Sequence, residues 1–203
     1  VRSLLGGTAL IAEHNVEYQR LKDQNPDLSL SGYEFVRQTE LMLCNQVDQV
    51  ITVSQKDKRQ LMQDGVQAYH IHYIPHGVDL ESFDVHEEIN VREAFQLSAD
   101  EAVLVYHGTY LYPPNMEAVT VMAEEIMPLL RQWGIQAQLL AVGPHPPADS
   151  QWPDVIFTGS VERVALYLRA ADMAVVPLRQ GGGTRMKILD YFAAGLPVVS
   201  TAK

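Results

Sequence analysis

The chain has 203 residues, of which 47% are hydrophobic and 20% are charged, a composition typical of a globular protein and unlike that of a disordered or fibrous one. Its 15 basic and 25 acidic residues give a formal net charge of −10, which opposes a broad phosphate-binding surface for nucleic acid. We therefore expect no nucleic-acid partner, although a few local donors can still bind a small anion.

Cysteine content and hydropathy bear on the compartment. Cys44 is the single cysteine, so an intramolecular disulfide is excluded, and its apolar neighbours at 41–43 predict a buried thiol. No apolar run approaches the ~20 residues of a membrane span, and no signal-peptide pattern opens the chain. We predict a cytoplasmic protein without a transmembrane segment, for which peripheral membrane contact stays open. Because the chain starts at Val1 and stops at Lys203 after an apolar run, we expect both ends to be cut from something longer.

Short apolar runs alternate with helical patterns in the first 80 residues, which is typical of βαβ units and a mainly parallel sheet. A helix is expected after Ser54, whose side chain should cap it, with Asp57 as the capping-box acid and Gly65 at its end. The other predicted elements here are strands at 9–12, 50–53 and 71–75 and a helix at 32–47.

From Leu80 to Asp100 the alternation weakens and acidic residues cluster, so we place a domain boundary between residues 87 and 88. The alternation then resumes, and Pro128 should kink the first of the helices that follow. The predicted elements are strands at 102–106, 138–142, 155–157, 173–176 and 197–200, and helices at 115–133, 161–171 and 184–194.

The segment 177–190 carries the clearest chemistry, because three consecutive glycines at 181–183 lie between a predicted strand and a helix that begins near Thr184. Such glycines let backbone N–H groups crowd an anion, and a helix N-terminus adds its dipole. Arg185 and Lys187 are placed in the first helical turn, where basic side chains oppose the dipole unless an anion offsets them. The pattern predicts a phosphate site; a flexible glycine turn beside two solvated bases is the alternative.

Other sites receive less support from the sequence. No Gly-Lys-Ser/Thr closes the glycine segment and no G-x-G-x-x-G occurs, which disfavours phosphoryl transfer and NAD chemistry. His70 and His72 share one face of a predicted strand and His76 follows, so a metal site is conceivable. No nearby cysteine or carboxylate completes a ligand set, and a solvated strand face explains the spacing equally well.

Four segments, in order along the chain, resemble the retaining group one (family four) glycosyltransferases of GT-B fold. Residues 171–201 are similar to that family's donor-site signature, and residues 106–115 to the first turn of its donor domain. Residues 48–54 resemble its strand followed by a serine before a helix, and residues 74–83 resemble its Ile-Pro-Asn-Gly-Val-Asp-x-x-x-Phe crossover. The resemblance spans nearly the whole chain.

The resemblance implies an α/β fold class, with a GT-B-type pair of Rossmann-like domains whose sheets are mainly parallel and which are both incomplete in this chain. Residues 1–87 would be the C-terminal part of the N-terminal, acceptor-side domain together with the crossover. Residues 88–203 would be the N-terminal part of the C-terminal domain, which binds the nucleotide-sugar donor.

The resemblance also implies roles for single residues. Asp190 stands where the family has a Glu that binds the ribose hydroxyls, and Gly182 stands where a second Glu contacts the donor sugar. His14 matches a family histidine on the acceptor-side wall near the anomeric carbon, and it ends a strand where ligands bind in open α/β folds. The family's phosphate-binding Arg and Lys fall near Thr109 and Pro114 and are missing.

Arg185 and Lys187 are the expected replacements for that missing pair. The predicted catalytic residues are therefore His14, Arg185 and Lys187. The predicted donor-binding residues are Gly108, Thr109, Gly181, Gly182, Gly183, Thr184, Arg185, Lys187 and Asp190.

For the activity, the resemblance implies transfer of a sugar, with retention, from a UDP- or GDP-linked donor to a glycan, lipid or small-molecule acceptor. No cofactor is expected, and the absence of an Asp-x-Asp pattern argues for metal independence. The 203-residue chain alone is expected to be inactive. A non-catalytic sugar-nucleotide-binding module and a GT-B-fold sugar-nucleotide epimerase are the alternatives. The donor base, its sugar, the acceptor and the oligomeric state stay open.

Overall fold

The computed structural model describes residues 6–25, 27–84, 90–148, 152–179 and 184–201. The chain divides into two compact units, one of residues 1–77 with 180–185 and the other of residues 78–179 with 186–203. We call them the first and the second unit. The boundary predicted between residues 87 and 88 lies outside the described residues.

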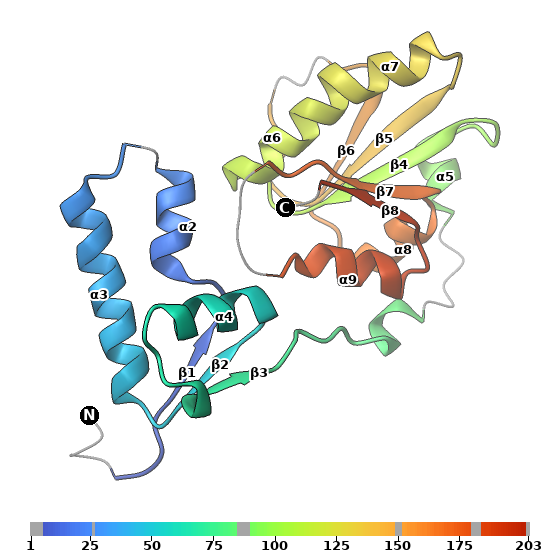
Figure 1. The fold of residues 1–203 in the computed structure, drawn as a ribbon. Coiled ribbons are helices and arrows are strands. Elements are labelled where there is room, and N and C mark those ends of the chain that lie inside the picture. Colours follow the sequence, from blue (N-terminus) through green and yellow to red (C-terminus); the bar gives the residue numbers. More distant parts are fainter. Residues whose placement is uncertain (1–5, 26, 85–89, 149–151, 180–183, 202–203) are drawn as a thin grey trace. The chain divides into compact units, whose positions relative to one another are not determined.

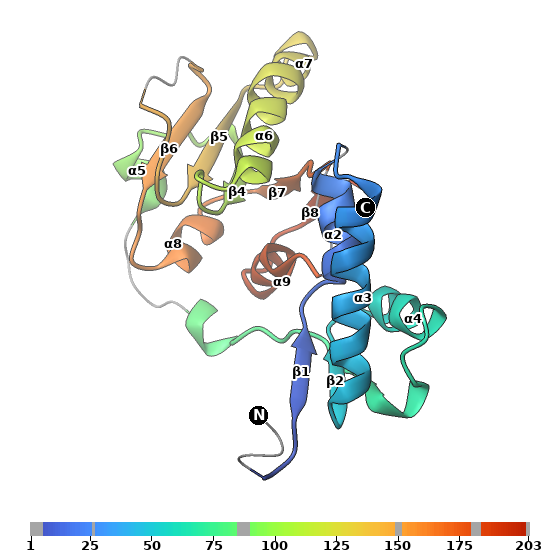
Figure 2. The same ribbon diagram turned by 90° about the vertical axis from the view of Figure 1, so that its left-hand side faces the viewer.

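The first unit is built on a parallel sheet of three strands in the order β1-β2-β3 (Figures 1 and 2). The strands are β1 (Leu10–Glu13), β2 (Gln49–Thr52) and β3 (Ile71–Tyr73), and the helices are α2 (Glu17–Gln24), α3 (Leu30–Gln46), α4 (Gln55–Gln63) and the 3-10 turn η1 (Ala68–His70). Its core is formed by Val16, Tyr18, Cys44, Val50, Leu61, Val66 and Ile71. Cys44 is fully buried, as predicted.

Local signals explain α4, whereas α2 depends on a distant residue. Ser54 Oγ accepts a hydrogen bond from the Asp57 backbone N–H at 3.0 Å, which confirms the predicted cap of α4. Helix α2 was not predicted from the sequence, and the side chain of its own N-cap residue makes no capping hydrogen bond. Instead the carboxylate of Glu40, in α3, accepts from the N–H groups of Glu17 at 2.8 Å and Tyr18 at 2.9 Å. An anion at this end also complements the helix dipole.

The second unit contains a parallel sheet of five strands in the order β6-β5-β4-β7-β8. The strands are β4 (Ala102–His107), β5 (Ala137–Val142), β6 (Val155–Gly159), β7 (Met173–Val176) and β8 (Val198–Ser200). The helical segments are η2 (Glu81–Phe83), α5 (Val91–Ala94), α6 (Pro113–Val121), η3 (Met122–Ile126), α7 (Met127–Gln132), α8 (Val164–Arg169) and α9 (Met186–Ala193). In Figure 1, α6 and α7 lie on one face of this sheet and α8 and α9 on the other.

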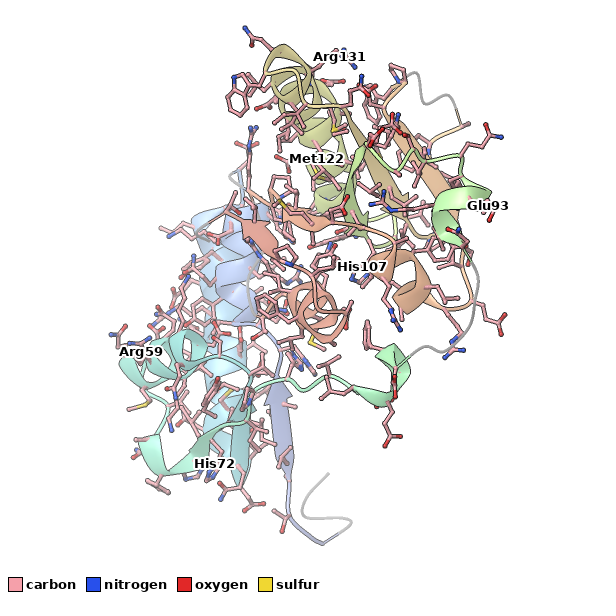
Figure 3. The ribbon with its side chains drawn as sticks, turned by 90° about the vertical axis from the view of Figure 1, so that its right-hand side faces the viewer. Arg59, His72, Glu93, His107, Met122 and Arg131 are labelled. Atoms are coloured by element: carbon pink, nitrogen blue, oxygen red, sulfur yellow. The ribbon has the colours of Figure 1, made fainter. Side chains whose placement is uncertain are left out.

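Pro128, which was predicted to kink its helix, follows a π-helical segment. Pro128 has no N–H and so cannot make the α-helical bond to the carbonyl four residues earlier. The segment η3 before it has π-helical hydrogen bonding, and Met122 in that segment is fully buried (Figure 3). Trp133, the last residue of the predicted helix at 115–133, lies just after α7 and is 70% exposed.

Carboxyl groups gather between β1, α3 and α4 in the first unit. Burial, with a smaller contribution from the Glu40 carboxylate, raises the pKa of Glu13 to about 7. Cys44 Sγ donates to Glu13 Oε1 at 3.6 Å, and burial raises the pKa of this thiol to about 12. Among the described residues, the buried Asp57 Oδ2 and Thr52 Oγ1 have no hydrogen-bond partner. The folded first unit therefore holds a proton on Glu13 at a pH where an unfolded chain would release it.

We predict that replacing Glu13 by glutamine makes the stability of the chain less dependent on pH. Because the folded-state pKa lies above the ordinary 4.5, the contribution of Glu13 to the free energy of unfolding is complete below pH 4.5 and is lost as the pH rises through 7. At 1.36 kcal/mol per pKa unit the loss is up to about 3 kcal/mol. Glu13→Gln should therefore raise the unfolding temperature at pH 8 and change it little at pH 5.

Thermal unfolding followed by circular dichroism at pH 5, 6.5 and 8 measures this effect. Asp27→Asn removes an exposed carboxyl group from the same unit and serves as the control, which should follow the wild type at every pH. A Glu13→Gln variant that loses as much stability as the wild type between pH 5 and 8 would contradict the assignment.

Candidate functional site

The candidate site lies in the second unit at the carboxyl ends of β4 and β7. From β4 the chain proceeds through β5 to β6, and it then crosses to the other side of β4 to form β7 and β8. In open α/β sheets, the point at which the strand order reverses is where ligands bind, outside the carboxyl ends of the strands. His107 is the last residue of β4, and Gly108 and Thr109 follow it at this point.

Lys187, in the first turn of α9, reaches the end of β4. Its Nζ donates to Tyr106 Oη at 2.5 Å and to Asn115 Oδ1 at 2.8 Å, and it lies 3.8 Å from the centre of the Tyr106 ring. Tyr106 Oη in turn donates to Asn115 Oδ1 at 2.7 Å. Tyr106 is fully buried and Asn115 is 8% exposed, so these polar groups require one another. The ammonium is held in one place by three separate contacts.

The same asparagine fixes the turn that follows β4. Asn115 Nδ2 donates to the Thr109 carbonyl at 2.9 Å. A Cβ atom on Gly108 would lie 2.6 Å from Asn115 Nδ2, and one on Gly143 would lie 2.0 Å from the Gly108 carbonyl oxygen. Both positions therefore need glycine, because the backbone packs against itself and against Asn115 here.

His107, labelled in Figure 3, and Asp190 form the neighbouring part of the site. His107 Nε2 lies 3.3 Å from Asp190 Oδ2, although no hydrogen bond to this buried nitrogen has suitable geometry among the described residues. The backbone N–H of His107 donates to Tyr191 Oη at 3.0 Å, and the two rings meet edge to face with centres 5.0 Å apart. Burial raises the pKa of Tyr191 well above its ordinary value, so this hydroxyl stays neutral.

The structure thus brings four of the predicted donor-binding residues into one region of the second unit: Gly108, Thr109, Lys187 and Asp190. Gly181, Gly182 and Gly183 lie outside the described residues. Thr184 and Arg185 belong to the segment that groups with the first unit. The helix was predicted to begin near Thr184 with Arg185 in its first turn. It begins at Met186, so Arg185 precedes it and only Lys187 of the two bases is helical.

Two histidines of the first unit stack on each other, and two others contact different side chains. His14, predicted to be catalytic, follows β1, is exposed, and stacks on His76 with ring centres 5.4 Å apart and planes at 18°. His72 hydrogen-bonds the Gln49 side chain of the neighbouring strand, and His70 packs against the Tyr69 ring. Within the described ranges, no three His, Cys, Asp or Glu side chains are grouped so that they could hold a metal ion.

Sequence reasoning missed four residues of the site, namely Tyr106, His107, Asn115 and Tyr191. Tyr106 was read as part of an apolar strand and Asn115 as the start of a helix. A signal was present for Asn115, because an amide close to the end of a buried strand must find partners there. The partners themselves could not be named, because Lys187 is 72 residues further along the chain.

None of the helices in the described part of the chain combines the length and the apolar character that a membrane span requires.

Solved structures with the same fold are glycosyltransferases and related synthases. HepE of Anabaena, solved in complex with UDP and glucose, is 18% identical, covering 94% of this chain and 52% of its own with a TM-score of 0.67. WaaG, a glycosyltransferase involved in lipopolysaccharide biosynthesis, is 16% identical over 97% of this chain and 57% of its own, with a TM-score of 0.72. Sucrose-phosphate synthase of Thermosynechococcus elongatus is 23% identical over 99% and 52%, also with a TM-score of 0.72.

These likenesses confirm the expected fold class, α/β with mainly parallel sheets and of GT-B type. The chain spans about half the length of these three structures. A search of curated proteins found no match. Residues 8–82 match the model of glycosyltransferase family 4, and residues 101–203, half of the chain, match that of the group 1 glycosyl transferases. The two matches follow the order of the two units, and the chain belongs to the group 1 glycosyl transferases.

Proposed function

We propose that the protein transfers a sugar from a nucleoside-diphosphate sugar, linked to UDP or GDP, to a glycan, lipid or small-molecule acceptor, with retention and without a metal ion. The second unit would bind the donor. The observation that carries this proposal is the ammonium of Lys187 beside the Gly108–Thr109 turn, at the switch point of the sheet. Family membership and the UDP and glucose in the HepE complex support a nucleotide-sugar donor.

The chemistry needs positive charge where the diphosphate leaves. When the bond between the anomeric carbon and the diphosphate oxygen breaks, both electrons go to the oxygen, and negative charge builds up on the leaving group. Lys187 and the N-terminal N–H groups of α9 would stabilise this charge, and Arg185, which directly precedes α9, would add to them. Donors that are already in place gain strength because they need no rearrangement during the reaction.

Asp190 would bind the ribose. Lys187 and Asp190 are three residues apart in α9 and so lie on neighbouring positions of one helix face, about 4.5 Å apart along its axis. The Asp190 side chain is 27% exposed, which leaves its carboxylate open to ribose hydroxyls. This spacing suits a nucleotide whose phosphates lie at the helix N-terminus and whose ribose lies further along the helix. His14, in the first unit, is proposed to serve on the acceptor side.

The family match favours neither the sugar-nucleotide epimerase nor the non-catalytic binding module. An epimerase needs an acid and a base around the sugar, and Asp190 is assigned here to the ribose. A binding module is distinguished by experiment on a full-length protein that contains this chain, since a binding module would bind the donor without releasing nucleoside diphosphate.

We expect substitutions at Lys187 and Asp190 to have different effects on ligand affinity. A charge-assisted hydrogen bond contributes roughly 1.5–3 kcal/mol, so Lys187→Met should weaken UDP or GDP binding about ten- to a hundredfold and leave the nucleoside unchanged. Asp190→Asn should weaken the nucleoside and the diphosphate alike, because both carry the ribose. Calorimetric titration with UDP, uridine, GDP and guanosine measures these affinities.

Lys56→Met removes an exposed lysine of the first unit and controls for the change of net charge. It should bind all four ligands as the wild type does. If Lys187→Met weakens the affinity for the nucleoside as much as that for the diphosphate, the phosphate assignment is wrong. If the wild-type protein binds none of the four ligands, the proposed function is wrong.

We also expect donor turnover to survive chelation, because cationic side chains and helix N–H groups, with no bridging metal, are proposed to neutralise the diphosphate. Because the 203-residue chain alone is expected to be inactive, release of UDP or GDP from the sugar nucleotide is measured on a full-length glycosyltransferase that contains this chain, with and without excess EDTA. The rate should stay within about twofold. Loss of activity that magnesium or manganese restores would contradict metal-independent transfer.

A further inference from the structure

The hydrogen bonds around Lys187 have a fixed direction. Lys187 donates to Tyr106 Oη and Asn115 Oδ1, Tyr106 Oη donates a hydrogen bond to Asn115 Oδ1, and Asn115 Nδ2 donates to the Thr109 carbonyl. The Asn115 side chain therefore uses its oxygen towards α9 and its nitrogen towards the turn after β4. Asn115 therefore links the start of α9 to the turn after β4, two segments that are far apart in the sequence.

The partners of the ammonium in this network are neutral. Tyrosine and asparagine orient the Lys187 Nζ and bring no negative charge of their own, in contrast to the carboxylates that two arginines of the second unit contact. Arg92 is paired with Asp172 at 2.7 Å, and Arg179 with Glu125 at 3.1 Å. A neutral acceptor does not compete with a bound anion for the cation, whereas a carboxylate acceptor would.

A structural role alone accounts poorly for the polar groups at these positions. Tyr106 is fully buried at the end of an apolar strand, where phenylalanine would fill the same space without a hydroxyl that needs partners. Lysine has a flexible four-carbon stem, so its ammonium samples many positions unless contacts restrict it. Tyr106 restricts the Lys187 ammonium through two contacts, a hydrogen bond to the hydroxyl and a cation–π contact with the face of the ring.

We propose that Tyr106 and Asn115 are positioning residues, which hold the Lys187 ammonium and the Gly108–Thr109 turn in the arrangement that receives the donor diphosphate. This inference rests on the proposed function. Tyr106 acts on the diphosphate only through Lys187. Asn115 acts through Lys187 and, separately, through the carbonyl of Thr109.

A double-mutant cycle between Tyr106 and Lys187 tests whether the tyrosine acts through the lysine. Titrations use UDP and uridine, or GDP and guanosine if the wild type binds those. Tyr106→Phe keeps the ring and removes the hydroxyl, and it should weaken diphosphate binding about five- to tenfold with the nucleoside unchanged. In the Lys187→Met background, Tyr106→Phe should cause no further loss.

The control and the outcomes separate this inference from the proposed function. Tyr167→Phe alters another tyrosine of the second unit, one in α8, and should bind as the wild type does. If Lys187→Met weakens diphosphate binding but Tyr106→Phe does not, the positioning role is wrong and the proposed function stands. The positioning role is also wrong if Tyr106→Phe weakens diphosphate binding equally in the wild-type and Lys187→Met backgrounds, or if it weakens nucleoside binding as much as diphosphate binding. If Lys187→Met has no effect, both the phosphate assignment and this inference fail.

Asn115→Asp provides a second variant. The carboxylate still accepts from Lys187 but cancels its charge, and it cannot donate to the Thr109 carbonyl. Diphosphate affinity should fall at least about tenfold, and more than in Tyr106→Phe, with the nucleoside affected less. Thermal unfolding of each variant shows whether it is folded. A folded Asn115→Asp variant that binds the diphosphate as tightly as the wild type would overturn the role of Asn115.

Discussion

Strand β4 is hydrogen-bonded on both edges by parallel neighbours, and the second unit is arranged around it. It pairs with β5 from Ala102 to His107 and with β7 at Leu104 and Val105. Its central residues are buried, as expected for a strand covered on both faces. Because the chain leaves β4 on one side and returns on the other, the carboxyl end of this strand is where the order reverses. The contact between Lys187 and Tyr106 lies at that end.

The chain as a whole is acidic, yet its candidate site includes a lysine near the turn that follows β4. The formal net charge is −10, yet the site presents an ammonium that touches two neutral side chains. Charges at a distance are screened by salt over about 10 Å, whereas donors in direct contact with a ligand act at full strength. A chain with excess acid can therefore bind a diphosphate, provided that a few donors are held in place.

The two units stabilise their buried polar groups in different ways. In the first unit a carboxylate, Glu40, supplies the missing cap of α2, and the neighbouring Glu13 is kept protonated by burial. In the second unit the buried polar groups near the site are the neutral Tyr106, Asn115 and Tyr191. The first arrangement makes stability depend on pH near neutrality, and the second orients Lys187 through neutral side chains.

The sequence by itself determined the strands, the parallel α/β class and the cap of α4, because these features depend on neighbouring residues. An apolar run predicts a buried strand from the residues of the run alone. The cap is equally local, because Ser54 accepts its hydrogen bond from the N–H of Asp57, three residues further on. The family resemblance, later confirmed by the match of residues 101–203, also named Lys187 and Asp190 as site residues, although their roles remain predictions.

Only the tertiary structure decided α2 and the surroundings of Lys187. The cap of α2 comes from Glu40, more than 20 residues away, and the lysine meets Tyr106 across 81 residues and Asn115 across 72. No periodicity or spacing along the chain encodes such pairs. They arise because the parallel order of the strands brings the end of β4 to the start of α9, and buried polar groups that meet there must satisfy one another.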